Sequence, residues 1–193
     1  MVINRNLWIF ALELTSLRMN RIGVFCSASS NIDAIYSDNA QLFGEWLGKN
    51  NKTLVYGGVN RGLMEVIGKT AHRYGGEVIG VIPKKLQEHA SEYLDQRIIT
   101  EGLSDRKETI LQYSDILVAF PGGIGTLDEV FHVLAGKYIG AHNKKVIFYN
   151  INGHYSSLLT CLAEYKRNGF VGTDLSSLYE VANTDSELRT LLK

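Results

Sequence analysis

A glycine-rich turn followed by two carboxylates is the part of this sequence best suited to chemistry. It reads Phe120-Pro121-Gly122-Gly123-Ile124-Gly125-Thr126-Leu127-Asp128-Glu129. Glycines leave room for a backbone to approach an anion, and the first N–H groups of a following helix, unpaired within it, favour phosphate. Thr126 adds a hydroxyl donor. The pattern predicts a phosphate site formed by Gly122, Gly123, Gly125 and Thr126.

Asp128 and Glu129 are expected in the first turn of that helix, beside the anion. Acidic residues stabilise a helix start by about 0.3–1 kcal/mol, so a structural role explains Asp128 equally well. Thr126 and Glu129 are three residues apart and share a face, so the rest of a bound phosphorylated molecule would pass Glu129. Glu129 is therefore the candidate catalytic residue and Asp128 a candidate for substrate binding. Placement at a helix start is expected to favour the ionised form of Glu129.

The pair Arg106-Lys107 is a second candidate element. An Arg-Lys pair is by itself more often solvated surface than a site. The arginine nevertheless offers a planar fork to phosphate, ribose hydroxyls or purine acceptors, and it stays charged at any working pH. From the sequence alone both interpretations stay open.

Alternating strands and helices must position these residues. Short apolar runs predict strands, and apolar residues at helical spacing predict helices between them. A polar connection through Glu88, His89 and Glu92 follows the third strand. The expected strands are 22–26, 53–56, 78–82, 98–99, 114–119, 145–149 and 178–181, and the expected helices are 34–49, 62–74, 104–113, 155–168 and 185–192. A further helix is expected after the glycine turn, where apolar residues recur at helical spacing: Leu127, Val130, Phe131, Leu134 and Tyr138.

This order predicts an α/β fold with a doubly wound parallel sheet covered by helices on both faces. No repeat, linker or low-complexity segment divides the chain, so residues 19–193 are expected to form a single domain. Ligands of such sheets bind beyond the carboxyl ends of the strands. The glycine-rich turns lie at those ends and are expected to converge on one pocket.

Composition limits the range of functions. The 193 residues carry 20 basic and 20 acidic side chains, a formal net charge of zero, which argues against a nucleic-acid or anionic-membrane binder. Cys26 and Cys161 lie far apart with no CxxC or paired histidines, so neither a zinc site nor a disulfide scaffold is indicated, and a reduced cytoplasmic setting is expected. The five histidines are scattered and are interpreted as surface or structural residues.

Residues 1–18 are the unusual part of the chain. Their apolar run, residues 7–12, is interrupted by Glu13, lacks a cleavage site for a signal peptide, and is too short to span a bilayer. We expect either that Met19 is the natural start, with residues 1–18 an extension, or that these residues form an extra amphipathic helix.

The central motif resembles the PGGxGTxxE signature of the LONELY GUY (LOG) family, the cytokinin riboside 5′-monophosphate phosphoribohydrolases, often mislabelled as lysine decarboxylases. Residues 24–30, VFCSASS, resemble the family's FCGSS loop, and residues 54–64, LVYGGVNRGLM, resemble its VYGGGxxGLM segment. Residues 78–84 and 104–107 also fall in the family's order. The resemblance covers residue 19 to the C-terminus.

The resemblance implies a Rossmann-like fold and hydrolysis of the N-glycosidic bond of a cytokinin nucleoside 5′-monophosphate or AMP, releasing free base and ribose 5-phosphate. It implies Arg106 as the catalytic partner of Glu129, Lys107 as a substrate-binding neighbour, and Glu88 as the match to a ligand-contacting glutamate. It further implies a homodimer. The chemistry requires no metal and no organic cofactor, and nothing in the sequence specifies a pyridoxal-phosphate site.

Several residues depart from the family pattern. Val59 replaces a glycine, Ser27 replaces the loop glycine, Glu65 replaces a small residue, and Leu103 lies where methionine is common. Residues 135–138 differ from the stretch found in plant members, so base recognition is left open. Gly136 lies inside a helix, at a cost of about 1 kcal/mol relative to alanine, which indicates close packing or a bend there.

Two other functions compete with the hydrolase. One is a non-catalytic nucleotide carrier on the same fold, related to the molybdenum-cofactor carriers, which would bind a phosphorylated ligand without cleaving it. The other is a dinucleotide oxidoreductase, which is disfavoured because no GxGxxG follows the first strand.

Overall fold

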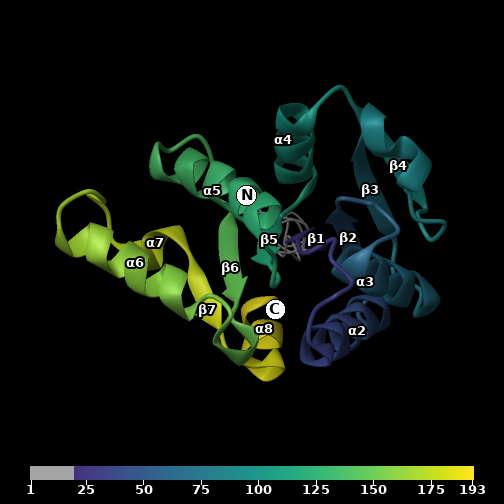
Figure 1. Cartoon of the computed structure of the whole chain (residues 1–193), viewed down its shortest axis with the longest axis horizontal. Coiled ribbons are helices and arrows are strands. Elements are labelled where there is room, and N and C mark those ends of the chain that lie inside the picture. The colour runs from purple at the N-terminus through teal and green to yellow at the C-terminus, as the bar shows by residue number, and fades with distance from the viewer. Residues whose placement is uncertain (1–19) are drawn as a thin grey trace, which may run out of the picture.

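A seven-stranded sheet runs through the centre of the molecule (Figure 1). The computed structural model describes residues 20–193, so the expectations for residues 1–18 and for Met19 lie outside the described residues. Every strand pairs in parallel with its neighbours, in the order β4-β3-β2-β1-β5-β6-β7. The expected doubly wound parallel sheet is confirmed.

The strands lie close to their expected positions. Two, 53–56 and 145–149, have the bounds that the sequence predicts, whereas the strand expected at 98–99 extends over five residues. Leu178, expected to open the last strand, belongs instead to a short helix. The strands are β1 (Arg21–Phe25), β2 (Thr53–Tyr56), β3 (Val78–Pro83), β4 (Gln96–Thr100), β5 (Ile116–Ala119), β6 (Lys145–Tyr149) and β7 (Glu180–Ala182).

The helices also follow the predicted order. The short helices η1, η2 and α7 were not expected, and η1 takes the place of the predicted polar connection. Helix α5 begins at Ile124, three residues before Leu127, the first of the apolar residues at helical spacing. The helices are α2 (Ala34–Lys49), α3 (Gly62–Arg73), η1 (Lys84–His89), α4 (Leu103–Tyr113), α5 (Ile124–Tyr138), η2 (Ile151–Gly153), α6 (Ser156–Arg167), α7 (Leu175–Leu178) and α8 (Asp185–Leu191).

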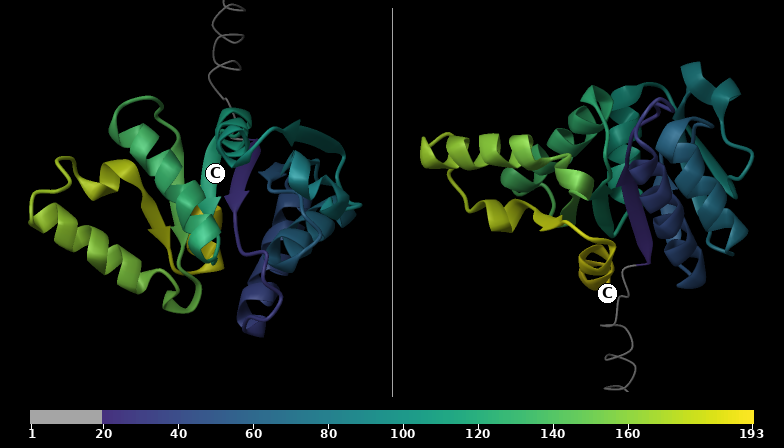
Figure 2. Two further views of the ribbon diagram at one scale, coloured as in Figure 1. Left: turned by 45° about the horizontal axis from the view of Figure 1, so that its top comes forward. Right: turned by 60° about the horizontal axis from the view of Figure 1, so that its bottom comes forward.

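Two hydrophobic cores lie on opposite faces of the sheet, because successive side chains of a strand point to opposite faces. On one face α2, α3 and α8 pack against the sheet through Phe43, Leu63 and Leu188. On the other face α4 and α5 pack through Ile110 and Val130, with α6 and α7 beside them. Figure 2 shows the two helix layers from further directions.

The chain changes direction across the sheet between β1 and β5. From β1 the strands run outward to β2, β3 and β4, and the chain then returns to β5 on the other side of β1 before continuing to β6 and β7. In open α/β sheets this reversal leaves a crevice beyond the carboxyl ends of the two strands, where ligands bind. The loops after β1 and β5 carry Cys26-Ser27-Ala28 and the glycine turn.

Candidate active site

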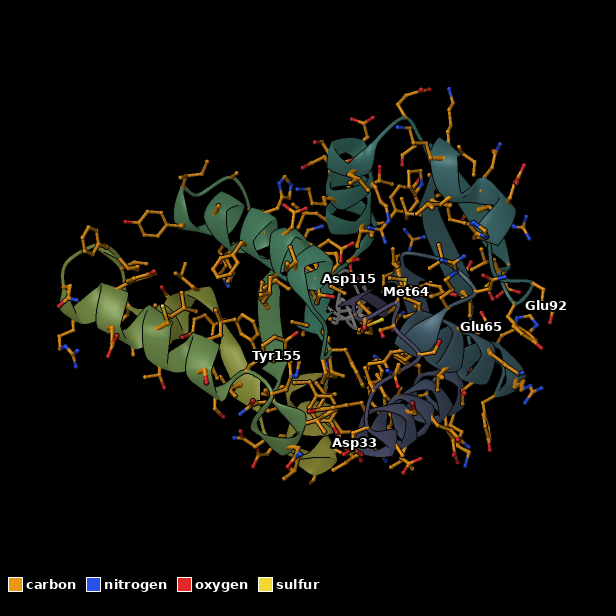
Figure 3. The ribbon with its side chains drawn as sticks, viewed as in Figure 1. Asp33, Met64, Glu65, Glu92, Asp115 and Tyr155 are labelled. Carbon is orange, nitrogen blue, oxygen red and sulfur yellow. The ribbon has the colours of Figure 1, made fainter. Side chains whose placement is uncertain are left out.

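A cavity of about 370 Å³ lies beyond the carboxyl ends of β1 and β5, at the predicted place. Its wall combines charged side chains from α4 and α5 with apolar side chains from the loop after β2 and from α3, η1 and α4. Figure 3 labels Met64 close to the middle of the molecule, at the start of α3. The lining residues are Cys26, Ser27, Ala28, Val59, Met64, Leu86, Leu103, Arg106, Lys107, Gly123, Gly125, Thr126, Asp128 and Glu129.

The start of α5 forms one end of this cavity. A Cβ at Gly122 would overlap the side chain of Thr126, so only glycine lets the turn pack against the buried threonine. Gly123 and Gly125 face open space, with no atom within 4 Å of a Cβ placed on either. The first amides of α5 are therefore accessible to an anion, as expected for a phosphate site.

The two carboxylates are one turn further along α5 than the sequence predicts. Gly123 is the residue before the helix, with φ −99° and ψ −148°, and no acidic residue lies in the first turn. The prediction that Asp128 and Glu129 occupy that turn is wrong, because the helix already includes Ile124 and Gly125. These two residues have neither a buried apolar side chain nor a cap signal, so the sequence does not mark them as helical. Glu129 therefore lies beneath the phosphate end, in the second turn.

Glu129 forms a buried ion pair with Arg106. Nη1 of Arg106 donates to Oε1 of Glu129, and the two side chains are 11% and 7% exposed. The Nε of Arg106 also donates to the carbonyl of Val81, at 3.1 Å. A Cβ at Gly57 would overlap Nη2 of Arg106, so the glycine after β2 provides the space that the guanidinium occupies. Strands β2 and β3 thus fix the arginine that faces Glu129.

Burial raises the pKa of Glu129, and the positive charge and hydrogen bond of Arg106 oppose that rise. Asp128 raises the pKa further, and Lys107 lowers it. The expectation that a helix start favours the ionised form is therefore corrected: burial favours the neutral acid, and Arg106 is the main partner that favours the carboxylate. A carboxyl group with a raised pKa in a cavity is typical of a catalytic acid or base.

Lys107 and Asp128 form a second link between α4 and α5. Nζ of Lys107 lies 2.9 Å from both carboxylate oxygens of Asp128. The lysine is 13% exposed, whereas Asp128 is 56% exposed. Arg106 thus pairs with Glu129, and Lys107 pairs with Asp128. The two ion pairs bring four of the predicted residues together.

Two predicted residues lie outside this cavity. Gly122 lines an adjoining hollow of about 280 Å³, behind the glycine turn. Glu88 is exposed on η1 and is absent from the lining of either space, although its neighbour Leu86 lines the cavity. Its ligand-contacting role stays a prediction.

Sequence reasoning missed the apolar part of the wall. Met64 and Leu86 carry no functional signal, because a single methionine or leucine beside a strand end is indistinguishable from core. Val59 and Leu103 are noticeable only as departures from the family pattern. Leu103 is 61% exposed and Leu86 is 38% exposed, which leaves apolar surface at the rim of the cavity.

Other side chains near the site have structural environments. Burial raises the pKa of the Cys26 thiol, and Glu129 raises it further, which disfavours the nucleophilic thiolate. Gly136 packs against the ring of His142, with a Cβ there 3.2 Å from two ring atoms, so the expected close packing is confirmed. Within residues 20–193, no group of three histidine, cysteine, aspartate or glutamate residues could hold a metal ion. None of the helices in that range could span a membrane.

Known proteins resemble this chain over most of its length. A family model described as "Possible lysine decarboxylase" matches residues 64–192. The cytokinin riboside 5′-monophosphate phosphoribohydrolase LOG5 of Arabidopsis thaliana is 34% identical over 179 residues, 92% of this chain and 78% of that protein. LOG2 of the same plant is 35% identical over 184 residues, 94% and 86% of the two chains.

Among solved structures, the molybdenum cofactor binding protein from the phototrophic bacterium Rippkaea orientalis superposes with a TM-score of 0.70. It shares 26% sequence identity, and the match covers 92% of this chain and 97% of the bacterial protein.

Proposed function

Because this chain belongs to the LONELY GUY (LOG) family, we propose that it hydrolyses the N-glycosidic bond of a nucleoside 5′-monophosphate to free base and ribose 5-phosphate. The observation that carries the proposal is the buried Arg106–Glu129 pair, which lines the same cavity as the open amides at the start of α5. One helix thus presents a phosphate site and, a turn away, a carboxylate.

In this mechanism the 5′-phosphate binds at Gly122, Gly123, Gly125 and Thr126. The bound phosphate is remote from the bond that breaks, and its binding energy positions the sugar against Glu129. Lys107 and Asp128 line the cavity beside it and complete the proposed substrate-binding set.

Bond cleavage leaves positive charge on the sugar, as in glycoside hydrolysis. The Glu129 carboxylate stabilises that oxocarbenium character and takes a proton from the water whose oxygen attacks the anomeric carbon. The electron pair of the N-glycosidic bond leaves with the base, which gains a proton. Arg106 keeps Glu129 ionised and, with its remaining N–H groups, orients the nucleotide.

The base is proposed to be adenine, with or without an apolar substituent of the cytokinin type. Val59, Met64, Leu86 and Leu103 provide an apolar wall beside the charged residues, which supports this assignment. Incubating the protein with a series of nucleoside 5′-monophosphates and measuring the released base would rank the candidates.

The test of the reaction class is product analysis with AMP, using adenosine as the matched substrate without a phosphate. The proposal expects adenine and ribose 5-phosphate from AMP and much slower release from adenosine. Unchanged AMP after prolonged incubation with folded protein would contradict it.

A carrier function is the alternative, because the R. orientalis relative is a molybdenum cofactor binding protein whose fold matches over most of this chain. A carrier would bind a phosphorylated ligand through the same helix start and return it unchanged. The buried Arg106–Glu129 pair favours the hydrolase, because binding alone does not need a carboxylate of raised pKa in the cavity.

We propose that the enzyme is a cytoplasmic homodimer. The support is an apolar region around the C-terminal half of α5, where Phe131, Tyr138, Ile139 and Phe170 are exposed by 39%, 48%, 78% and 79%. Both described cysteines are free, which fits a reducing compartment. Light scattering would measure twice the chain mass for a dimer, and the mass of one chain would contradict this part of the proposal.

A further inference from the structure

Three successive carbonyl groups of the turn before α5 each have a hydrogen-bond partner. The hydroxyl of Tyr155 donates to the carbonyl of Phe120 at 2.6 Å, and the amide of Ser27 donates to that of Pro121 at 3.1 Å. Nε2 of His154 lies 3.0 Å from the carbonyl of Gly122. Figure 3 labels Tyr155, which lies beside β6. Two adjacent residues after β6 thus support the turn that begins the phosphate site.

The contact to Gly122 determines the direction of the next amide. In a planar trans peptide the C=O and N–H groups point in opposite directions. When His154 donates to the Gly122 carbonyl, that carbonyl faces the hollow behind the turn, and the Gly123 N–H faces away from it. Gly123 lines both the hollow and the cavity that holds Glu129, so this peptide separates the two spaces.

The same ring nitrogen can also make the opposite bond. Nε2 of His154 lies 3.2 Å from the Gly122 nitrogen. An unprotonated Nε2 accepts from the Gly122 N–H and leaves the carbonyl without this donor. A doubly protonated ring has donors on both nitrogens, so its Nε2 can only donate to the carbonyl. The two bonds are therefore alternatives, and a proton on Nε2 selects between them. The doubly protonated ring always carries that proton, whereas the neutral ring carries it in only one of its two tautomers.

We propose that His154 is a positioning residue of the phosphate site, which donates to the Gly122 carbonyl and thereby directs the Gly123 N–H toward the bound phosphate. The inference rests on the proposed function only in taking the start of α5 as the place where phosphate binds. Phosphate and the protonated ring stabilise the same arrangement of the turn, so each increases the affinity for the other. Lower pH then tightens phosphate binding through His154.

The side chains packed against His154 are uncharged. The titratable groups packed against it are Tyr36 from α2 and Tyr155 at the start of α6, with ring centroids at 5.7 and 4.7 Å. Burial raises the pKa of the Tyr155 hydroxyl, which stays neutral. Within residues 20–193, no charged side chain forms an ion pair or hydrogen bond with His154.

The test compares His154→Phe, which keeps the ring shape but has no donor, with His154→Gln, which keeps an amide donor but does not titrate. His72→Gln is the control, because His72 lies on α3 and contacts Asp95 and Tyr93 instead of the turn. Calorimetry measures the affinity of each protein for inorganic phosphate at about pH 6 and about pH 8, within the range where histidine titrates. Ionisation of phosphate itself is common to all the proteins and cancels in their ratios.

We expect His154→Phe to bind phosphate about five- to tenfold more weakly than wild type at the lower pH, at the low end of usual coupling factors, and almost equally at the higher pH. His154→Gln should bind phosphate more tightly than His154→Phe at the lower pH. The ratio of wild-type to His154→Gln affinity should change less with pH than the ratio of wild-type to His154→Phe affinity. In hydrolysis assays the KM for AMP should rise in His154→Phe while kcat is retained and adenosine turnover is unchanged.

Equal phosphate affinity in wild type and His154→Phe at both pH values would overturn the proposal. An equal loss at both pH values, with a lower melting temperature, would also overturn it, because that pattern indicates general support of the fold. If the phosphate measurements agree with the expectation but no base is released from AMP, the proposed hydrolase fails and the role of His154 stands.

Discussion

Glu129 can hold a negative charge in a buried position because the guanidinium of Arg106 lies against it. Transferring an unpaired carboxylate into a protein interior is costly, and the group responds by taking up a proton. The pair therefore sets the protonation state on which the proposed reaction depends. Asp128, the adjacent carboxylate on the same helix, is exposed and paired with Lys107. It therefore allows the effect of a buried carboxylate to be compared with that of an exposed one.

Glu129→Gln should lose AMP hydrolysis by orders of magnitude and keep both its fold and its AMP binding. The amide preserves the size of the side chain but can neither accept the proton of water nor stabilise positive charge on the sugar. Asp128→Asn is the control, because it makes the same change one residue away and should keep a substantial part of the activity. Turnover rates and circular dichroism of both variants test this, and near-native turnover in folded Glu129→Gln would remove Glu129 from the mechanism.

Arg106→Met should reduce the free energy of unfolding by about 3–5 kcal/mol, because it leaves a buried carboxylate without its partner. Adding Glu129→Gln to this variant should restore part of the stability, since the amide removes the unpaired charge. Urea unfolding of the two single variants and the double variant measures the coupling. Additive losses in the double variant would show that the two side chains do not stabilise each other.

The pH dependence of hydrolysis should follow the raised pKa of Glu129. Activity requires the ionised form, so kcat should increase with pH through a midpoint above the ordinary glutamate value. Stability should change in the opposite direction. The native state binds this proton more tightly than the unfolded state, so the contribution of Glu129 to stability is lost as pH rises between the ordinary and the raised pKa. A kcat profile with its acidic midpoint at or below the ordinary value would contradict this assignment.

Single residues were predictable where their type is chemically unusual. Asp128 and Glu129 could be identified as candidates, since carboxylates beside a glycine turn require an explanation, whereas Arg106 and Lys107 became candidates through the family resemblance. The role of Gly57 could not be predicted, because the guanidinium that fills the space beside it belongs to Arg106, 49 positions further along the chain. The sequence favours a surface or structural role for His154, and only the structure brings its ring to Gly122.

At the scale of elements, the start of α5 combines tight packing with open space. Gly122 is packed against Thr126, while Gly123 and Gly125 face the cavity. The sequence predicts all three glycines as phosphate-binding residues and gives no means of separating these two roles. The helix start was misplaced for a related reason, because exposed glycine and isoleucine do not contribute to the apolar periodicity of a helix.

This difference among the glycines predicts an effect on binding without an effect on folding. Gly125→Ala should keep or slightly increase stability, because alanine is favoured over glycine in a helix by about 1 kcal/mol and the new methyl group meets no protein atom. The methyl group should nevertheless occupy the space of the anion and raise the KM for AMP. Thermal unfolding and AMP kinetics test the two halves, and the control is Gly122→Ala, which should lower stability through its clash with Thr126.

At the scale of the whole molecule, the sheet order explains why distant segments meet. Strands β1 and β5 are adjacent in the sheet, although their first paired residues, Ile22 and Ile116, are 94 positions apart in the sequence. Alternation of strands and helices was sufficient to predict a doubly wound sheet and a pocket at its carboxyl edge. The ion pairs between α4 and α5 depend on how these two helices pack against each other at that edge. The apolar periodicity of the sequence does not specify that packing.

The central claim is that the start of α5 binds the 5′-phosphate while Glu129 faces the anomeric carbon of the sugar. A crystal structure of Glu129→Gln with AMP tests it most directly, because the variant should bind the nucleotide without cleaving it. We predict the phosphate hydrogen-bonded to the amides that begin α5 and to Thr126, with the side chain at position 129 directed at the sugar. A phosphate bound elsewhere, or a side chain at position 129 turned away from the sugar, would contradict the account.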